Sequence, residues 1–285
     1  MNKIDLSSVD IDDYLTTISI DKIKDSLSND KYKMITDRLE LLIKADFKTI
    51  LKYVNIANHY SEEEKKEIKN AFNYTSHRKK TNFMEHFKKL KIKSCPFCNN
   101  NYIYFYKKDA SDDYNTLATL EHYYPKAKYP HLSLSFYNLI PCCSICNSKF
   151  VGTDNHIGKI SHPYSDDFDE NATFSVKLKK FETNLEFDID LKTYDKKSKT
   201  SVDRFKLDEI YKEHDDIAKE IWHKSQYYNE SRIEELYKEF YKNMGYTKED
   251  VKNLIFCNYL KKEDINKRNH AKLTQDILRQ FNIKD

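Results

Sequence analysis

Apolar residues recur every three or four positions along the flanks of the chain, a spacing typical of amphipathic helices. Residues 33–54 contain one such series, which predicts a helix with a single buried stripe: Ile35, Leu39, Leu42, Ile43, Phe47, Ile50, Leu51 and Val54. Ser61 and Glu64 have the spacing of a capping box, so we expect a second helix to begin at Ser61. The helical spacing returns after about residue 205, with Gly245 placed to end one helix and Thr247 to begin the next.

A different pattern precedes the C-terminal helices. Apolar and polar residues alternate in residues 173–180 and again in residues 185–192, which predicts a β-hairpin. Two polar stretches are interpreted as connections: residues 107–116 as a loop between strands, and residues 195–201 as a linker.

The centre of the chain is built from other residue types than its flanks. All five prolines, two of the three glycines and five of the six cysteines lie between residues 95 and 163. Proline and glycine interrupt helices, so this segment is expected to hold short strands and loops. The fold class predicted from these patterns is α+β and helix-rich.

Composition narrows the class of protein further. The 285 residues include 33% charged and 14% aromatic side chains. The aromatic side chains supply enough apolar area for a globular core despite the high charge, which excludes a disordered chain. No segment approaches the roughly 18 continuous apolar residues of a membrane span, and the first residues do not resemble a secretory signal. We therefore expect a cytoplasmic protein without membrane contact.

Positive charge is concentrated in one stretch. Residues 77–93 carry seven Lys and Arg against one Glu, a net charge of +6, whereas the whole chain has a net charge of +3. Such a stretch can neutralise phosphates, but it can equally be the solvated face of a helix, and the sequence leaves both interpretations open.

Four cysteines form two Cys-x-x-Cys pairs, Cys95 with Cys98 and Cys143 with Cys146. Two such pairs produce a tetrahedral four-sulfur zinc site when the intervening chain returns on itself, and a site filled by four thiolates is structural. Cys142 and Cys257 are left as buried or spare cysteines. The sequence thus predicts a structural Zn²⁺ ion.

Polar residues suited to phosphodiester hydrolysis lie inside the loop that this zinc would close. Hydrolysis requires a hard cation near the phosphate oxygens and a base that accepts a proton from water. Glu121 and His122 offer a carboxylate and an imidazole, one to bind a metal and the other to handle the proton. Asn147, directly after the last cysteine, offers a further oxygen ligand.

The order of these residues resembles a known family. The first Cys-x-x-Cys pair, then "LEHYYPK", then "YNLIPCCSICNSKF" are similar to the HNH endonucleases with a ββα-metal module, over about residues 95–150. The segment is particularly similar to the zinc-knuckle subgroup found among bacterial restriction, mobile-element and phage-defence proteins, including Septu and retron-associated HNH effectors. The resemblance implies a metal-dependent endonuclease, with DNA favoured over RNA as substrate and an anti-phage role.

The resemblance also implies a role for each matching residue. His122 would be the general base, Glu121 and Asn147 would bind the catalytic Mg²⁺ or Mn²⁺, and Asn138 would orient His122 through hydrogen bonds to the backbone. Candidate phosphate contacts nearby are Lys126, Lys128 and Lys149. The family more often has Asp where this chain has Glu121, and often His where it has Asn147; both differences favour an oxygen-only metal site.

With the resemblance, four regions are expected. They are an N-terminal helical region (1–92), an HNH nuclease module with a four-cysteine zinc knuckle (93–165), a β-hairpin (166–200) and a C-terminal helical region (201–285). The flanking regions would select the substrate or bind a partner ATPase or sensor protein. Two alternatives stay open: an RNase of the same type, such as a tRNA-cleaving toxin, and a zinc-knuckle module that binds nucleic acid without cutting it.

Overall fold

The fold was analysed in a computed structural model, which describes residues 1–107, 114–151, 158–181 and 185–283. Helices dominate the described residues, together with three two-stranded antiparallel sheets. The prediction of a helix-rich α+β chain is confirmed at this level. The contacts divide the chain into two compact units, which we describe separately.

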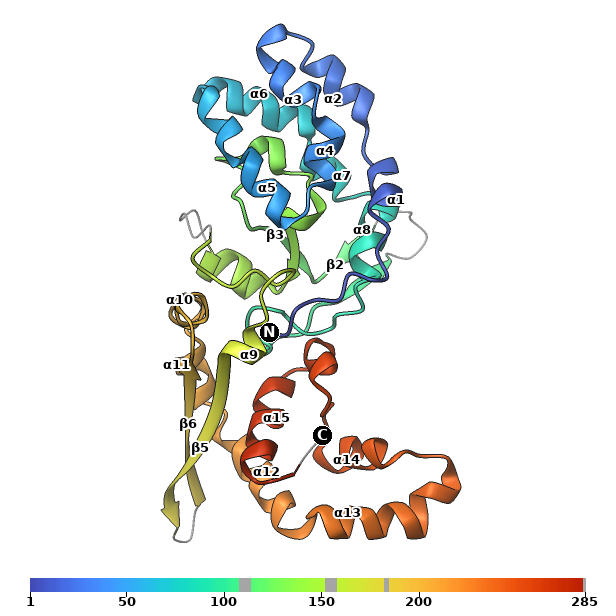
Figure 1. The fold of residues 1–285 in the computed structure, drawn as a ribbon, viewed down its shortest axis with the longest axis vertical. Helices are drawn as coiled ribbons and strands as arrows, with labels where there is room; N and C mark the ends of the chain where they lie inside the picture. Colours follow the sequence, from blue (N-terminus) through green and yellow to red (C-terminus); the bar gives the residue numbers. More distant parts are fainter. Residues whose placement is uncertain (108–113, 152–157, 182–184, 284–285) are drawn as a thin grey trace. The chain divides into compact units, whose positions relative to one another are not determined.

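The N-terminal unit comprises Ile4–Ile92 and Ile103–Ile157. Its first part consists of short helices (Figure 1). These are α1 (Ile11–Thr16), α2 (Ile20–Ser26), η1 (Asp30–Tyr32), α3 (Lys33–Thr36), α4 (Leu39–Lys44), α5 (Phe47–Tyr53), η2 (Val54–His59), α6 (Glu62–Phe72), α7 (Tyr74–His77) and α8 (Thr81–Lys88). Its second part contains β1 (Phe105–Lys107), β2 (Tyr114–Thr116), β3 (Thr119–His122), η3 (Pro130–Leu132), η4 (Phe136–Asn138), β4 (Leu139–Cys142) and the π-helical segment η5 (Cys146–Val151).

The single helix predicted over residues 33–54 is wrong, because the segment forms three helices, α3, α4 and α5, and continues into η2. The α4 helix ends at Lys44, since the following Ala45 has a non-helical ψ of 120°. Asp46 starts α5 by accepting a hydrogen bond from the Thr49 amide at 2.8 Å. An aspartate in this position favours a new helix start over continuation. Leu51, expected in the buried stripe, is 51% exposed as a result.

The capping box at Ser61 is confirmed. The Glu64 amide donates to Ser61 Oγ at 3.2 Å, and the Ser61 amide donates to Glu64 Oε2 at 2.9 Å. Replacing Ser61 by Ala is expected to lower the free energy of unfolding by about 1 kcal/mol, because the Glu64 amide at the helix start loses its acceptor. Ser61→Gly, which keeps the start of α6 solvated, should cost only a few tenths of that, and equal urea midpoints for the two variants would contradict this role.

An aromatic cluster forms the core where α1 and α8 meet η4. Phe136 stacks on Phe87 with ring centroids 5.0 Å apart and contacts Tyr14 edge-on at 5.1 Å. The buried Tyr14 hydroxyl donates to the Leu134 carbonyl at 2.9 Å. These contacts fix the loop between β3 and β4 against the helices.

Most basic side chains of the stretch 77–93 are exposed to solvent, and one of them, Lys88, lies on helix α8. Within α8, Phe83, Met84 and Phe87 are buried, whereas Lys88 and the following Lys89 are exposed. The helix is therefore amphipathic, and its basic residues do not by themselves form a site.

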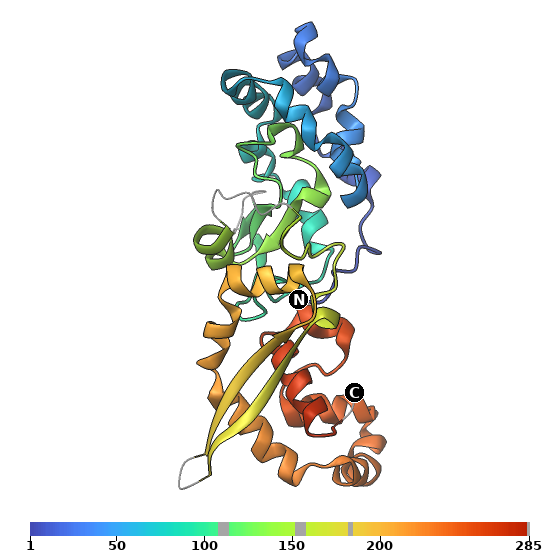
Figure 2. The ribbon, with the colours of Figure 1, turned by 60° about the vertical axis from the view of Figure 1, so that its left-hand side comes forward.

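The C-terminal unit comprises Met1–Lys3, Lys93–Tyr102 and Gly158–Asp285. Its elements are α9 (Phe168–Asn171), β5 (Ala172–Phe181), β6 (Leu185–Thr193), α10 (Lys196–Phe205), α11 (Leu207–Lys212), α12 (Asp215–Tyr227), α13 (Glu230–Leu236), η6 (Tyr237–Tyr241), η7 (Lys242–Met244), α14 (Lys248–Phe256), η8 (Lys262–Lys267) and α15 (Ala271–Gln280). The long hairpin of β5 and β6 confirms the predicted one, and Figure 2 shows it beside α15. Gly245, with φ of 83°, ends η7, and Thr247 starts α14 with a capping box, as predicted.

The linker predicted over residues 195–201 is wrong, because Lys196–Phe205 is the helix α10. Asp195 caps it by accepting from the Ser198 amide at 2.9 Å. Two of its buried side chains are serines, Ser198 and Ser201, which hide the helical pattern from a search for apolar residues.

Of the loop predicted over residues 107–116, residues 108–113 lie outside the described residues.

A buried ionic cluster connects α15 to α9 and β5. Lys272 lies 2.7 Å from carboxylate oxygens of Asp169 and Asp276, and Asp276 also accepts from the Phe174 amide at 2.7 Å. Lys272 is fully buried.

Among the helices of the described residues, none has the length and apolar character that a membrane crossing requires.

Candidate metal centre and candidate active site

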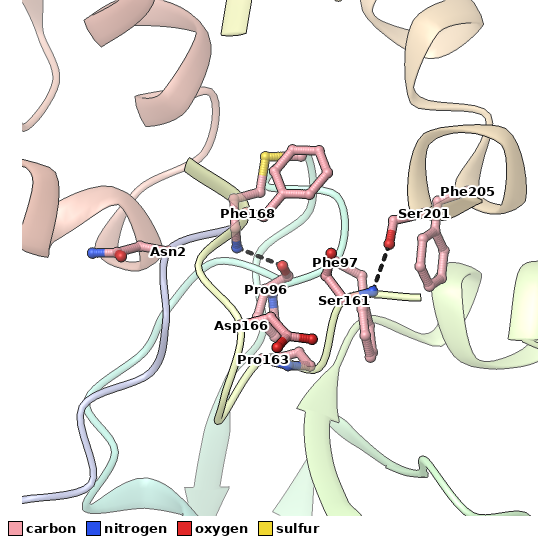
Figure 3. A pocket seen from close by; sticks show the side chains of 10 residues that line it. Asn2, Pro96, Phe97, Ser161, Pro163, Asp166, Phe168, Ser201 and Phe205 are labelled. Carbon is pink, nitrogen blue, oxygen red and sulfur yellow. Dashed lines mark hydrogen bonds between the residues drawn. The ribbon is translucent and has the colours of Figure 1, made fainter. Parts of the chain in front are cut away.

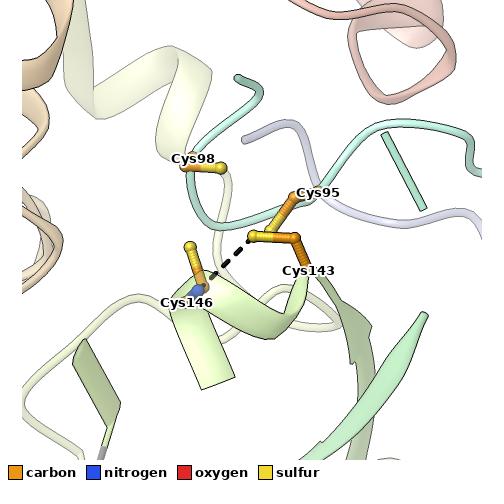
Figure 4. A group of neighbouring side chains, drawn as sticks. All are labelled: Cys95, Cys98, Cys143 and Cys146. Atoms are coloured by element: carbon orange, nitrogen blue, oxygen red, sulfur yellow. Dashed lines mark hydrogen bonds between the residues drawn. The ribbon is translucent and has the colours of Figure 1, made fainter. Parts of the chain in front are cut away.

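The four cysteines of the two Cys-x-x-Cys pairs come together in the structure (Figure 4). The sulfur atoms of Cys95, Cys98, Cys143 and Cys146 all lie within 4.8 Å of one another, and all four residues are buried. Thiolates around a tetrahedral Zn²⁺ ion, each bound at about 2.3 Å, fall within this range. The cluster can therefore hold a metal ion such as zinc.

Nearby N–H groups point to thiolate character at two of the sulfurs. The Cys146 amide donates to Cys143 Sγ at 3.4 Å, and the Asn100 amide donates to Cys98 Sγ at 3.5 Å. The Asn101 side chain adds a third donor, 3.7 Å from Cys98 Sγ. Donors of this kind stabilise a negatively charged sulfur, which is the form that binds a metal.

The other two cysteines are not part of this cluster. Cys142 is buried, with Thr119 Oγ1 3.4 Å from its sulfur, and Cys257 is exposed at the end of α14. The choice of Cys143 over Cys142 for the cluster, made from spacing, agrees with the geometry.

Two antiparallel strands followed by a helical segment carry the predicted active-site residues. β3 pairs with β4 so that Glu121 faces Ile140 and His122 faces Leu139 in the register. Asn147 lies in the first turn of η5, directly after Cys146, and η5 contacts β3. The chain thus returns to β3 twice, once through β4 and once through η5.

One pocket gathers most of the predicted site residues. It has a volume of about 310 Å³ and lies entirely within the N-terminal unit. Its lining consists of Tyr74, Arg78, Leu120, Glu121, His122, Pro125, Lys126, Ala127, Lys128 and Asn147. The structure therefore brings together Glu121, His122 and Asn147, with Lys126 and Lys128 beside them. Lys149 is exposed on η5 and is not among the lining residues.

His122 is held from one side by the backbone. Its Nε2 lies 3.1 Å from the Ser133 carbonyl oxygen. A carbonyl only accepts, so Nε2 carries the proton and Nδ1 carries the lone pair. Burial, with a smaller contribution from the Lys126 charge, lowers the pKa of His122 to about 3. The imidazole is therefore neutral near pH 7.

Asn138 clamps the loop that follows β3. Its Oδ1 accepts from the Tyr124 amide at 2.6 Å, and its Nδ2 donates to the carbonyls of Tyr124 at 3.2 Å and Leu132 at 2.8 Å. The side chain is fully buried and lines no part of the pocket. Its contacts are thus with the backbone of Tyr124 and of Leu132, the residue directly before Ser133, the partner of His122.

Among the polar and charged lining residues, two were not predicted as site residues from the sequence, Tyr74 and Arg78. Both come from the segment around α7, some 45 residues before His122. The Tyr74 ring contacts His122 edge-on, with centroids 4.5 Å apart, and Lys126 Nζ lies 4.7 Å from its centre. Arg78 belonged to the basic stretch, but nothing in that stretch distinguished it from its lysine neighbours. Tyr74 lacks any local signal, because its role depends on tertiary packing.

A smaller cavity in the C-terminal unit has a different character (Figure 3). Its volume is about 20 Å³, enough for about one water molecule. The carboxylate of Asp166 is already bound to Lys197 and to the His162 amide, and the Ser161 amide donates to Ser201 at 2.9 Å. These polar groups of the cavity are therefore already partnered within the protein.

Comparisons of the chain with protein-family models, with curated proteins and with solved structures find no match.

Proposed function

We propose that the chain is a metal-dependent HNH endonuclease that hydrolyses phosphodiester bonds, with DNA as the favoured substrate. One observation carries the proposal: a single pocket is lined by an imidazole, a carboxylate and an amide, with lysine and arginine side chains around them. The same pocket thus offers a base, oxygen ligands for a cation and positive charge for phosphate. These are the groups that metal-assisted phosphodiester hydrolysis requires.

Glu121 and Asn147 would hold the catalytic Mg²⁺ or Mn²⁺. Carboxylate and amide oxygens suit these hard cations, and both residues line the pocket from separate elements, β3 and η5. The bound cation would neutralise negative charge on the phosphate oxygens. With one carboxylate present, the substrate phosphate would complete the coordination.

His122 would accept the proton of the attacking water at Nδ1. The Ser133 carbonyl fixes the tautomer and the plane of the ring, while Tyr74 packs against its edge. Because burial keeps the imidazole neutral near pH 7, the lone pair is present before substrate arrives. Asn138 is a positioning residue, since it acts on the backbone that holds the Ser133 carbonyl. The four-cysteine zinc would brace the turn before Asn147.

The proposal is tested by cleavage of supercoiled plasmid and of total tRNA with Mg²⁺, Mn²⁺ or EDTA. We expect cleavage of the plasmid that requires the cation and stops with EDTA. Glu121→Gln should raise the Mg²⁺ concentration for half-maximal cleavage at least about tenfold, because it removes the ligand charge. Glu63→Gln, an exposed residue on α6, is the matched control and should behave as the wild type.

Each other outcome has a distinct meaning. Cleavage of tRNA but not plasmid would establish the RNase alternative. Binding of either polymer without cleavage under any condition would favour the zinc-knuckle binding module. If the chain alone does not cut, cleavage that begins on addition of a partner ATPase or sensor protein would support the anti-phage effector role that the resemblance implies.

A further inference from the structure

A second pocket adjoins the candidate active site. It has a volume of about 330 Å³, and its lining includes Lys69, Asn73, Tyr74, Lys126 and Ser133. Tyr74 and Lys126 line both pockets, so the two are neighbours across these side chains. Both lie in the N-terminal unit, and Lys126, a predicted phosphate contact, is the one predicted site residue that lines the second pocket.

Positive charge gathers along the two pockets, and Glu121 is the one carboxylate among their lining residues. In the part of the chain that the structure describes, Lys69, Arg78 and Lys126 form no ion pair. Burial lowers the pKa of Lys126, and the charges of Lys69 and Arg78 lower it further, while Glu121 alone opposes them. Such a group of cations is stabilised by a bound anion.

Two residues that line the second pocket also have buried hydroxyl groups without partners. Tyr74 Oη and Ser133 Oγ are both buried, and among the described residues neither has a hydrogen-bond partner. The exposed fractions of these residues are 6% and 1%. A buried hydroxyl without a partner costs free energy, which a hydrogen bond to a ligand oxygen would recover.

We propose that the second pocket binds the backbone phosphate next to the scissile phosphate of a nucleic-acid strand. Lys69 and Lys126 would supply the charge, and Tyr74 and Ser133 would supply hydroxyl donors. The proposal rests on the proposed function for the neighbouring pocket, because Lys126 lies on the border of both. Its consequence is that a strand of several nucleotides binds more tightly than a single phosphodiester.

Binding measured without catalysis separates this proposal from the nuclease activity. The probe is a fluorescent single-stranded DNA 12-mer in EDTA, with its dissociation constant measured over a salt series. We expect Lys69→Ala to weaken binding roughly three- to tenfold and to reduce the slope of log affinity against log salt by about one phosphate contact. Lys66→Ala, on the same helix but not lining the pocket, is the matched control and should match the wild type.

Ser133→Ala provides an independent readout. Because it removes a buried hydroxyl without a partner, it should leave the thermal midpoint unchanged or raised while weakening 12-mer binding. Equal dissociation constants and salt slopes for wild type, Lys69→Ala and Lys66→Ala would overturn the subsite, as would wild-type protein that does not bind the 12-mer. Reduced binding by Lys69→Ala in a protein that cuts neither plasmid nor tRNA would support the subsite and count against the nuclease.

Discussion

Replacing His122 by Ala is expected to lower the rate of metal-dependent cleavage by about 100- to 10,000-fold, the range for loss of a general base. The Ser133 carbonyl holds Nε2, so Nδ1 is the one ring nitrogen with a lone pair for the water proton. Alanine supplies no replacement base and leaves the proposed cation ligands and the lysines in place. The measurement is the single-turnover rate on plasmid with saturating Mg²⁺.

Two checks make this result specific. His59→Ala removes an exposed histidine on η2 and should keep the wild-type rate. His122→Ala should retain its zinc and bind the DNA 12-mer within about twofold of wild type, because the variant keeps the cationic groups. An unchanged rate in His122→Ala would rule out this residue as the base.

Replacing Cys143 by Ser is expected to have the largest effect on stability. A structural zinc in a small site contributes on the order of 10 kcal/mol of binding free energy, which stabilises the folded chain. With one thiolate lost, we expect the bound zinc, one ion per wild-type chain, to fall below about a tenth. The thermal midpoint should fall by more than about 10 °C, since the loss approaches the whole stability of a typical domain.

The adjacent Cys142 offers a closely matched control. Cys142→Ser alters a buried cysteine one position away that is not part of the cluster, so zinc content should stay at one ion per chain. Metal analysis of the purified proteins, with thermal unfolding before and after a chelator, gives both readouts. Equal zinc loss in both variants would show that the cluster has been assigned to the wrong cysteine.

Local features of the fold were predictable from sequence because each depends on a few adjacent residues. The capping boxes at Ser61 and Thr247 and the alternation in β5 and β6 are examples. The break before α5 also had a local signal, Asp46, but the continuous apolar spacing masked it. The α10 helix was missed because its buried face contains serines, which a search for apolar periodicity does not count.

The candidate site likewise contains residues that could be predicted from the sequence and residues that could not. The cysteines, Glu121, His122 and Asn147 could be selected because residue type and spacing limit their chemistry. Tyr74 and Arg78 could not, since only tertiary packing brings α7 beside β3. Sequence spacing therefore identified groups with distinctive chemistry, and the structure added the residues that shape and charge their surroundings.

The contacts that hold His122 are short-range along the chain, which has a consequence for folding. The partner of His122 lies 11 residues away, and Asn138 bonds to groups 6 and 14 residues away. Closing such short loops costs little chain entropy and proceeds quickly. We therefore expect the orientation of the imidazole to be set once residues 121–139 form their loop, whereas the wall made by Tyr74 must await the docking of the helices.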